Sequence, residues 1–347
     1  MQNNISKVIY HNTIPITGLF RICVNDLQVK EMFLVAFNNG KLGAFINNSN
    51  SNSKSESTQP YQTRYEINLN LQNNDYFVSC AQCNSLIILG TSSGLIYIQS
   101  IPSLLTNNIN NTQQPLILSG QSNLISYLTV IPLNNLISCS YDGTIFIRAI
   151  KDDNITLTKQ LQSSTNKTIK GAVYLQHHKT LLTVGEKIFM FWDINTFEQI
   201  TALQGMLPLI HINSIIEYDD TYIIWGTNES IVLFDMNIWW ANKVIKLGDN
   251  VHPYSLLKMT NGSVLIGCNG NRLLYLNPND NNKTKFIPQQ GNEAIEGTSS
   301  TFVVGMFEDV SNEKVVTASQ DGVVIELDIM YINNEKLSMD LNDIHIE

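Results

Sequence analysis

The residues Gly90-Thr-Ser92-Ser-Gly94 match the Gly-x-Ser-x-Gly pattern that presents a serine nucleophile in many hydrolases. That chemistry requires the serine to sit where a strand turns sharply into a helix. Here a second β-rich run, LIYIQSI, follows the motif. The sequence therefore predicts a strand, a turn and a strand at this place, and no catalytic serine.

Cys80-Ala-Gln-Cys83 has the spacing of a redox pair or of half a zinc site. The pair is single, and no second Cys or His pair follows at zinc-finger spacing. It also lies in an apolar run, which favours buried thiols. We expect no metal, no cofactor and no catalytic residue here. The five cysteines are an odd, low number for a chain of this length, as is typical of free thiols in a reducing compartment.

Asp142-Gly143 and Asp321-Gly322 could be read as catalytic carboxylates. Each pair, however, ends one β-rich run and begins another, as in NLISCSYDGTIFIRAI and EKVVTASQDGVVIELDI. Aspartate before glycine is typical of tight hairpin turns, where the carboxylate bonds to the local backbone. We expect all four residues to be structural.

The same turn recurs along the chain, so the sequence is a repeat. The turn positions fall 42 residues apart at the closest (229 to 271) and 54 at the widest (40 to 94). These positions are Gly40, Gly94, Gly143, Glu186, Glu229, Asn271 and Gly322. A period of 40 to 45 residues is typical of a four-stranded propeller blade. The wider intervals contain Asn- and Ser-rich stretches at 47–63, 106–115 and 277–285, for which we predict flexible loops.

Each repeat contains four β-rich runs, for example IKGAVYL, TLLTVG, KIFMFWDI and EQITALQG in the fourth. No convincing helix interrupts them. The sequence therefore predicts an all-β, seven-bladed β-propeller of four-stranded antiparallel blades. Because each blade buries its faces against its neighbours, we expect one domain over residues 1–330 with a C-terminal tail at 331–347.

The chain resembles the WD-repeat family over essentially its whole length. Trp192-Asp193 ends the third run of the fourth repeat, as in that family, and the Ser-x-Asp-Gly turn occurs at Ser140 to Gly143 and at Ser319 to Gly322. The resemblance implies structural roles for Trp192 and Asp193. It also implies that the N-terminal strand completes the last blade, so residues 5–10 should pair near 323–329.

The resemblance further implies a hydrogen-bonded network of Asp, His, Ser and Trp in each blade. The Gly-His pair that supplies the histidine is replaced here, by Gly120-Gln121, Gly205-Met206 and Gly248-Asp249. We expect the network to be incomplete in every blade, with apolar packing carrying more of the stability.

The charge of the chain excludes some partners. The net charge is −9, and only four arginines and no basic cluster occur, whereas a nucleic-acid binder needs clustered cations. Anionic membrane surfaces are disfavoured for the same reason. No apolar run approaches the 18 residues of a membrane span, and the N-terminus lacks the apolar core of a signal peptide. We expect an intracellular protein, in the cytoplasm or the nucleus.

Trp239-Trp240 is the strongest candidate for an interface, because aromatic residues are enriched at binding hot spots. The alternative is that these rings pack onto a neighbouring blade. Turn residues Tyr141, Glu186 and Gln320 are candidates on the opposite face.

The sequence thus favours a non-enzymatic interaction scaffold, a monomeric propeller acting as a subunit or adaptor of a larger complex with other proteins. The alternative is a propeller enzyme or small-ligand binder with a site at the central channel. That alternative would need polar side chains converging from several blades.

Overall fold

The structure is a computed structural model of the 347-residue chain. It describes residues 6–11, 13–23, 31–47, 61–69, 71, 74–105, 114–151, 154–162, 168–185, 188–204, 214–277, 284–287, 301–310, 313–332 and 339–340. The chain divides into two compact units, one formed by Ile16–Ala172 and the other by Met1–Pro15 together with Val173–Glu347. The division falls inside strand β14 (Ile169–Leu175).

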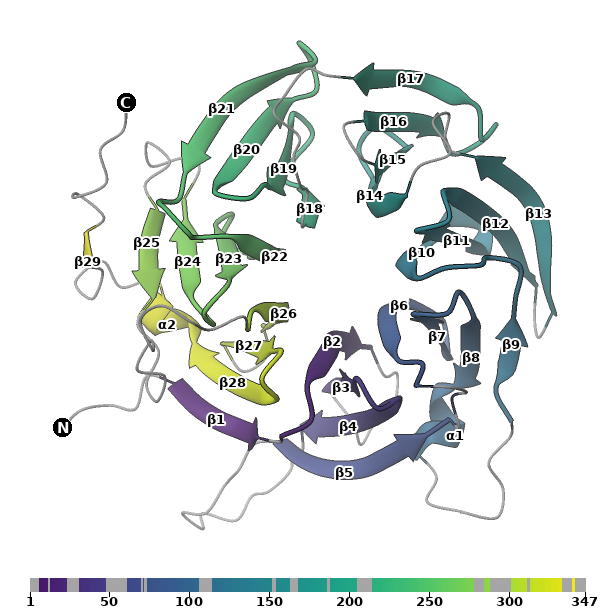
Figure 1. The fold of residues 1–347 in the computed structure, drawn as a ribbon, viewed down its shortest axis with the longest axis horizontal. Coiled ribbons are helices and arrows are strands. Elements are labelled where there is room, and N and C mark those ends of the chain that lie inside the picture. The colour runs from purple at the N-terminus through teal and green to yellow at the C-terminus, as the bar shows by residue number, and fades with distance from the viewer. Residues whose placement is uncertain are drawn as a thin grey trace. The chain divides into compact units, whose positions relative to one another are not determined.

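The unit of residues 16–172 holds three four-stranded antiparallel sheets, here called blades 1 to 3 (Figure 1). Blade 1 consists of β2 (Ile16–Ile22), β3 (Glu31–Phe37), β4 (Lys41–Asn47) and β5 (Tyr61–Asn68). Blade 2 consists of β6 (Phe77–Cys83), β7 (Leu86–Thr91), β8 (Ile96–Ser100) and β9 (Leu116–Leu118). Blade 3 consists of β10 (Ile125–Ile131), β11 (Asn135–Ser140), β12 (Thr144–Lys151) and β13 (Asn154–Gln162).

Blades 4 to 7 follow in the same strand order. Blade 4 consists of β14, β15 (Thr180–Gly185), β16 (Ile188–Asp193) and β17 (Gln199–Gln204). Blade 5 consists of β18 (Ser214–Glu217), β19 (Tyr222–Gly226), β20 (Ser230–Asp235) and β21 (Trp240–Lys246). Blade 6 begins with β22 (Pro253–Lys258), β23 (Val264–Cys268), β24 (Leu273–Leu276) and β25 (Thr284–Ile287). Blade 7 contains β26 (Val303–Asp309), β27 (Lys314–Ser319) and β28 (Val323–Asp328).

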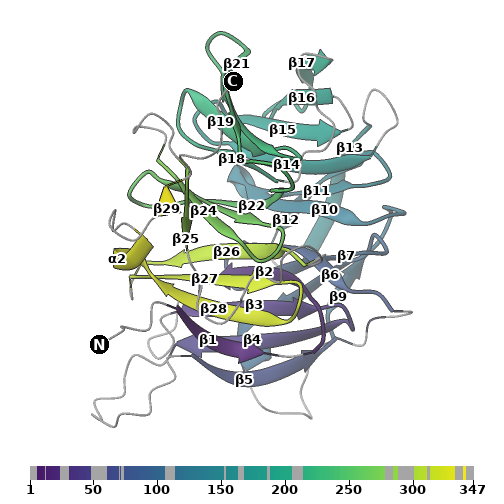
Figure 2. The same cartoon turned by 60° about the vertical axis from the view of Figure 1, so that its left-hand side comes forward.

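The fourth strand of blade 7 comes from the opposite end of the chain. β1 (Ser6–His11) runs antiparallel to β28, with Ser6 opposite Leu327 and His11 opposite Val323. Figures 1 and 2 both show this purple strand beside the yellow one. The expected pairing of residues 5–10 with 323–329 is confirmed, as is the all-β class with seven four-stranded blades.

The C-terminal segment adds a strand to blade 6 instead of blade 7. β29 (Met339–Asp340) pairs antiparallel with the outer edge of β25, which makes blade 6 five-stranded. The described residues also include short helical turns, at α1 (Ile101–Leu105), η1 (Pro132–Asn134) and α2 (Ile329–Ile332). Within the described ranges, no helix has the length and apolar character needed to cross a membrane. Most of the predicted loops 47–63, 106–115 and 277–285 lies outside the described residues, and their flexibility stays a prediction.

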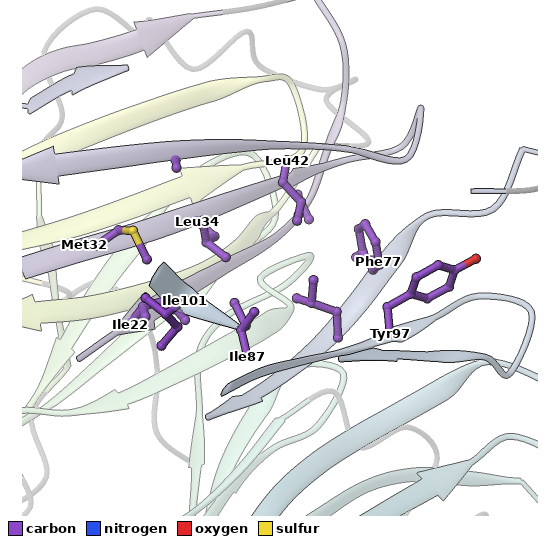
Figure 3. Packing of buried hydrophobic residues seen from close by; sticks show 11 residues of the cluster. Ile22, Met32, Leu34, Leu42, Phe77, Ile87, Tyr97 and Ile101 are labelled. Atoms are coloured by element: carbon purple, nitrogen blue, oxygen red, sulfur yellow. The ribbon is translucent and has the colours of Figure 1, made fainter. Parts of the chain in front are cut away.

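The blades pack face to face through nearly continuous apolar runs. Between blades 1 and 2, Leu34 and Leu42 meet Phe77, Ile87 and Tyr97, all essentially inaccessible to solvent (Figure 3). A strand buried on both faces has no polar alternation, which explains why the second and third strands read as unbroken hydrophobic runs.

Glycine is required on the second strands of blades 2 and 6, where the next blade approaches closely. A Cβ atom added to Gly90 would lie 2.7 Å from Ile125 Cγ2, and one added to Gly267 would lie 2.7 Å from Val303 Cβ. Such distances are too short for real Cβ contacts. Gly90 and Gly267 are therefore fixed by the close packing of the neighbouring blade.

Neighbouring blades are also joined by hydrogen bonds at the start of their first strands. The hydroxyl of Ser79 donates to the carbonyl of Ile125 in the next blade at 2.7 Å, and Ser255 donates to Val303 at 3.0 Å. The same arrangement links Thr17 to Phe77 and Ser126 to Ile169. At these four junctions, one small hydroxyl satisfies a carbonyl at the point where a new blade begins.

In a second set, at the far end of the first strands, a side chain of the later blade reaches back to the preceding blade. Glu308 accepts hydrogen bonds from the backbone N–H and the hydroxyl of Thr260 in the preceding blade, at 2.7 and 2.8 Å. Glu217 likewise accepts from the N–H groups of Gln176 and His177. The side chain of Gln82 exchanges hydrogen bonds with the backbone of Cys23. These long polar side chains hold the loop of one blade against the strand of the next.

Candidate protein-interaction site

The two Asp-Gly turns hold their carboxylates in local hydrogen bonds. Asp142 accepts from the N–H of Thr144 at 2.8 Å and from the N–H of Ser122 at 2.6 Å, while Gly143 adopts φ +84°. Burial raises the pKa of Asp142, but the hydrogen bonds from Thr144, Ser122 and Ser140 outweigh it and leave the pKa below its usual value. A carboxylate that accepts these hydrogen bonds braces the turn.

Asp321 occupies the equivalent turn of blade 7. Its carboxylate accepts hydrogen bonds from the hydroxyl of Ser319 and from the side-chain amide of Asn271 in blade 6. Gly322 adopts φ +88° and donates its N–H to the carbonyl of Ser319 at 3.1 Å. This turn therefore joins two blades as well as two strands.

Blade 4 contains the single Trp-Asp pair. The indole N–H of Trp192 donates to the hydroxyl of Thr183 at 2.9 Å inside the blade. Asp193 accepts from the N–H groups of Asn195 and Thr196 at 2.7 and 2.9 Å, and these bonds hold its pKa below the usual value. Trp192 thus fixes the core of the blade and Asp193 fixes the following loop.

Blade 3 forms a buried network with different residues. Ser138 donates to the side-chain oxygen of Gln121 at 2.6 Å and accepts from Arg148 Nη1 at 2.9 Å. Arg148 Nη2 donates to the carbonyl of Ser119, and the guanidinium lies 4.8 Å from the centre of the Phe146 ring. Burial lowers the pKa of Arg148 to about 10.

Blade 3 lacks the histidine and tryptophan of the Asp-His-Ser-Trp network, but it forms a network with other residues at the same ladder positions. Ser138 lies opposite Phe146 with Arg148 two residues further, just as Thr183 lies opposite Met190 with Trp192 two residues further. Gln121 and Arg148 therefore supply the hydrogen-bond donors and acceptors that histidine and tryptophan supply in the WD-repeat motif. Sequence reasoning missed this because it compared residue types and not hydrogen-bonding capacity.

The Gly90 to Gly94 segment is a hairpin turn between β7 and β8. Ser92 and Ser93 donate their hydroxyls to Asp75, and the N–H of Ser93 also donates to it at 2.9 Å. Blade 2 thus inverts the arrangement of blade 3, because the carboxylate comes from the loop that enters the blade and the donors come from the turn. Asp75 was not anticipated, since no Asp-Gly pair marks it.

Cys80 and Cys83 lie three residues apart on β6, so their side chains point to opposite faces of the strand. Burial raises the pKa of both thiols. All five cysteines are free. The Cys-x-x-Cys spacing therefore does not create a metal or redox pair in this strand.

Trp239 and Trp240 have different environments. Trp239 adopts φ +54°, and its ring packs edge-on against Phe191 of blade 4 with 4.8 Å between ring centres. Trp240, the first residue of β21, has 55% of its surface exposed. One ring therefore anchors blade 5 to blade 4, and the other faces solvent.

Other apolar side chains near Trp240 are also exposed. Ile238 is 64% exposed in the preceding turn, and Val244 is 53% exposed on β21. Ile200 of blade 4, at 55%, occupies the bulge of β17 opposite Phe191 and Trp192. We call Ile238, Trp240 and Val244 the blade 5 edge patch. Exposed apolar groups gathered on one element are typical of an interaction surface.

The turn residues singled out from the sequence are less accessible. Tyr141 and Gln320 are half-buried, and their N–H groups donate to Leu124 and Phe302 at 2.9 Å. Burial, with a smaller contribution from Tyr76, raises the pKa of Tyr141. Glu186 lies outside the described residues. In the part of the chain that the structure describes, no three His, Cys, Asp or Glu side chains gather in a way that could hold a metal ion.

A comparison of the sequence with protein-family models finds no match, and a comparison with curated proteins finds none. Solved structures do match. One is titled "Crystal structure of WD40 beta propeller domain of Doa1", with 14% identity, a TM-score of 0.68, and coverage of 95% of this chain and 98% of that one. Another, from "Crystal Structure of Mitotic Checkpoint Complex", has 13% identity, a TM-score of 0.63, and coverage of 94% and 97%. At these identities the likeness concerns the fold, and the chain has the fold of a seven-bladed WD40 β-propeller.

Proposed function

We propose that the protein is a non-enzymatic scaffold that binds a protein partner through the blade 5 edge patch, as a subunit or adaptor of a larger intracellular complex. The observation that carries this proposal is the exposure of Trp240, with Ile238 in the turn before it and Val244 further along the same strand also exposed. Tryptophan, with tyrosine and arginine, is enriched among the residues at the energetic centre of interfaces. Free thiols at all five cysteines support a reducing compartment, the cytoplasm or the nucleus.

The ionisable side chains of the turns support a scaffold more than an enzyme. The carboxylates of Asp75, Asp142 and Asp321 are engaged with hydroxyl, amide or backbone donors. No observation on the described residues favours the alternative of a site at the central channel. We propose the half-buried turn residues Tyr141 and Gln320, each in its own unit, as further contact points.

The test is to purify the tagged full-length chain from cells that express it and to quantify the proteins that co-purify. We expect at least one partner protein to co-purify with the wild-type chain in a fixed molar ratio. The Trp240→Ala variant should lose this partner, and the Leu133→Ala variant should retain it. Leu133 is 89% exposed and lies on blade 3, so it controls for the loss of any exposed apolar group. Equal recovery with all three chains would reject the patch, and recovery of no partner would reject the scaffold.

A further inference from the structure

The chain itself shows that the outer edge of a blade accepts an added strand. β29 pairs antiparallel with β25, with Asp340 opposite Lys285 and Met339 opposite Phe286. The register thus sets an acidic residue and an apolar residue of the added segment opposite a lysine and an apolar residue of the edge strand. This is the mode of recognition called β-augmentation, in which backbone hydrogen bonds supply affinity and alternate side chains supply specificity.

β21 has the same chemistry at the outer edge of blade 5. Its sequence, WANKVIK, contains Lys243 and Lys246 and no acidic residue. Among the outermost strands that the structure describes, β21 is the one with two lysines, in a chain whose net charge is −9. The edge is therefore locally basic on a protein that is otherwise acidic.

The ladder distributes these side chains over both faces of β21. Trp240 and Lys243 lie opposite Asp235 and Leu233, on the face directed toward blade 6. Val244 and Lys246 lie opposite Val232 and Ser230, on the face directed toward blade 4. A ligand lying flat against one face would reach only half of this set. A strand added at the edge places side chains beside both halves at once.

A bulge at Asn242 limits where pairing can occur. The ladder with β20 skips Asn242, so the regular part of the edge is Lys243–Lys246. β25 has the same length of four residues, and two of them, Lys285 and Phe286, pair with β29. Bulges commonly protect sheet edges from indiscriminate pairing, which leaves a short and selective site here.

We propose that the outer edge of β21 binds an extended, acidic segment of a partner protein as an antiparallel fifth strand of blade 5. This inference rests on the proposed scaffold function and specifies the partner as a peptide segment in which acidic and apolar residues are neighbours. Trp240 and Val244 then contact the apolar residues, and Lys246 faces an acidic one.

The experiment uses the full-length protein and a fluorescein-labelled peptide of residues 335–347, EKLSMDLNDIHIE, as a stand-in for an acidic strand. In the full-length chain the strand β29 already pairs with β25. We expect saturable binding by fluorescence anisotropy, weakened about fivefold by Lys246→Glu, as is typical of charge reversal at a rim position. Lys151→Glu changes the same charge at an exposed position on blade 3 and should leave the affinity unchanged.

Hydrogen–deuterium exchange locates the bound peptide. We expect new protection of the amides of residues 243–246, and recovery of affinity when the Lys246→Glu protein meets a peptide with Asp340 and Asp343 replaced by lysine. Protection confined to 284–287, equal weakening by Lys151→Glu, or no binding would overturn the inference. None of these results changes the co-purification test, so a scaffold that uses Trp240 without strand addition is distinguishable from a failed scaffold proposal.

Discussion

The guanidinium of Arg148 donates to the hydroxyl of Ser138 at 2.9 Å, in the ladder position where Trp192 donates to Thr183 one blade later. The two pairs perform the same task with a cation in one blade and an indole in the other. Arg148 is 4% exposed and its described partners are a hydroxyl and a carbonyl. Its burial therefore has an electrostatic cost that tryptophan avoids.

This equivalence predicts the effect of restoring the motif. Arg148→Trp should change the free energy of unfolding by less than about 1 kcal/mol, because it replaces a buried cation with a large side chain that keeps one donor. Arg148→Ala should cost about 2–4 kcal/mol, because it leaves a cavity and removes both donors. Urea unfolding of the three proteins measures both values. If the tryptophan variant is as unstable as the alanine variant, the positions are not equivalent.

The pKa of Asp142 predicts how stability depends on pH. Its folded pKa is below the unfolded value of 3.8 because hydrogen bonds from Thr144, Ser122 and Ser140 outweigh burial. The carboxylate therefore stabilises the fold above pH 3.8, and this contribution is lost as pH falls through the folded pKa.

Asp142→Asn keeps the shape and removes the charge. The stability difference between wild type and variant should be largest near pH 6 and should shrink steadily below pH 4, as followed by urea unfolding across that range. Asp220→Asn, in an exposed loop, is the matched control. A difference that does not vary with pH would show that Asp142 acts through shape alone.

The apolar runs and Asp-Gly turns specify the blades because they depend on local spacing and strand period. β1 was also predictable, since its run has no local partner. The roles of Gln121, Arg148 and Asp75 were not, because they depend on which donors and acceptors meet across a ladder or between loops. No pattern of neighbouring residues in the sequence predicts those hydrogen bonds.

The tryptophan pair shows the same limit. Strand alternation predicts that neighbouring rings point in different directions but not which one is buried. The positive φ of Trp239 sets that choice, because it turns this ring back onto Phe191.

Gly90 should tolerate no larger residue. Gly90→Ala places a Cβ atom 2.7 Å from Ile125 and should destabilise the protein by about 1–3 kcal/mol through overpacking. Gly262→Ala provides the contrast, because its Cβ meets only the Tyr218 hydroxyl at 3.9 Å, although φ is +83°. Its cost of about 1–2 kcal/mol should come from backbone strain. Ser79→Ala removes the Oγ atom that the new Cβ at residue 90 would also meet. In thermal unfolding, the loss for Gly90→Ala should therefore be smaller in a Ser79→Ala background, and the loss for Gly262→Ala should be unchanged.

Substitution of Trp239 should affect the stability of the fold, whereas substitution of Trp240 should affect the binding of a partner. Trp239→Ala removes the ring that packs on Phe191 and should cost about 2–4 kcal/mol in urea unfolding. Trp240→Ala should change stability by no more than about 0.5 kcal/mol, because the side chain is more than half exposed. The same Trp240 variant should lose the partner in co-purification. Trp239→Phe keeps an aromatic ring at the blade junction and should retain both partner and fold. Equal destabilisation by the two alanine variants would mean that Trp240 supports the fold. That result would contradict the proposal that the blade 5 edge patch is an interaction surface.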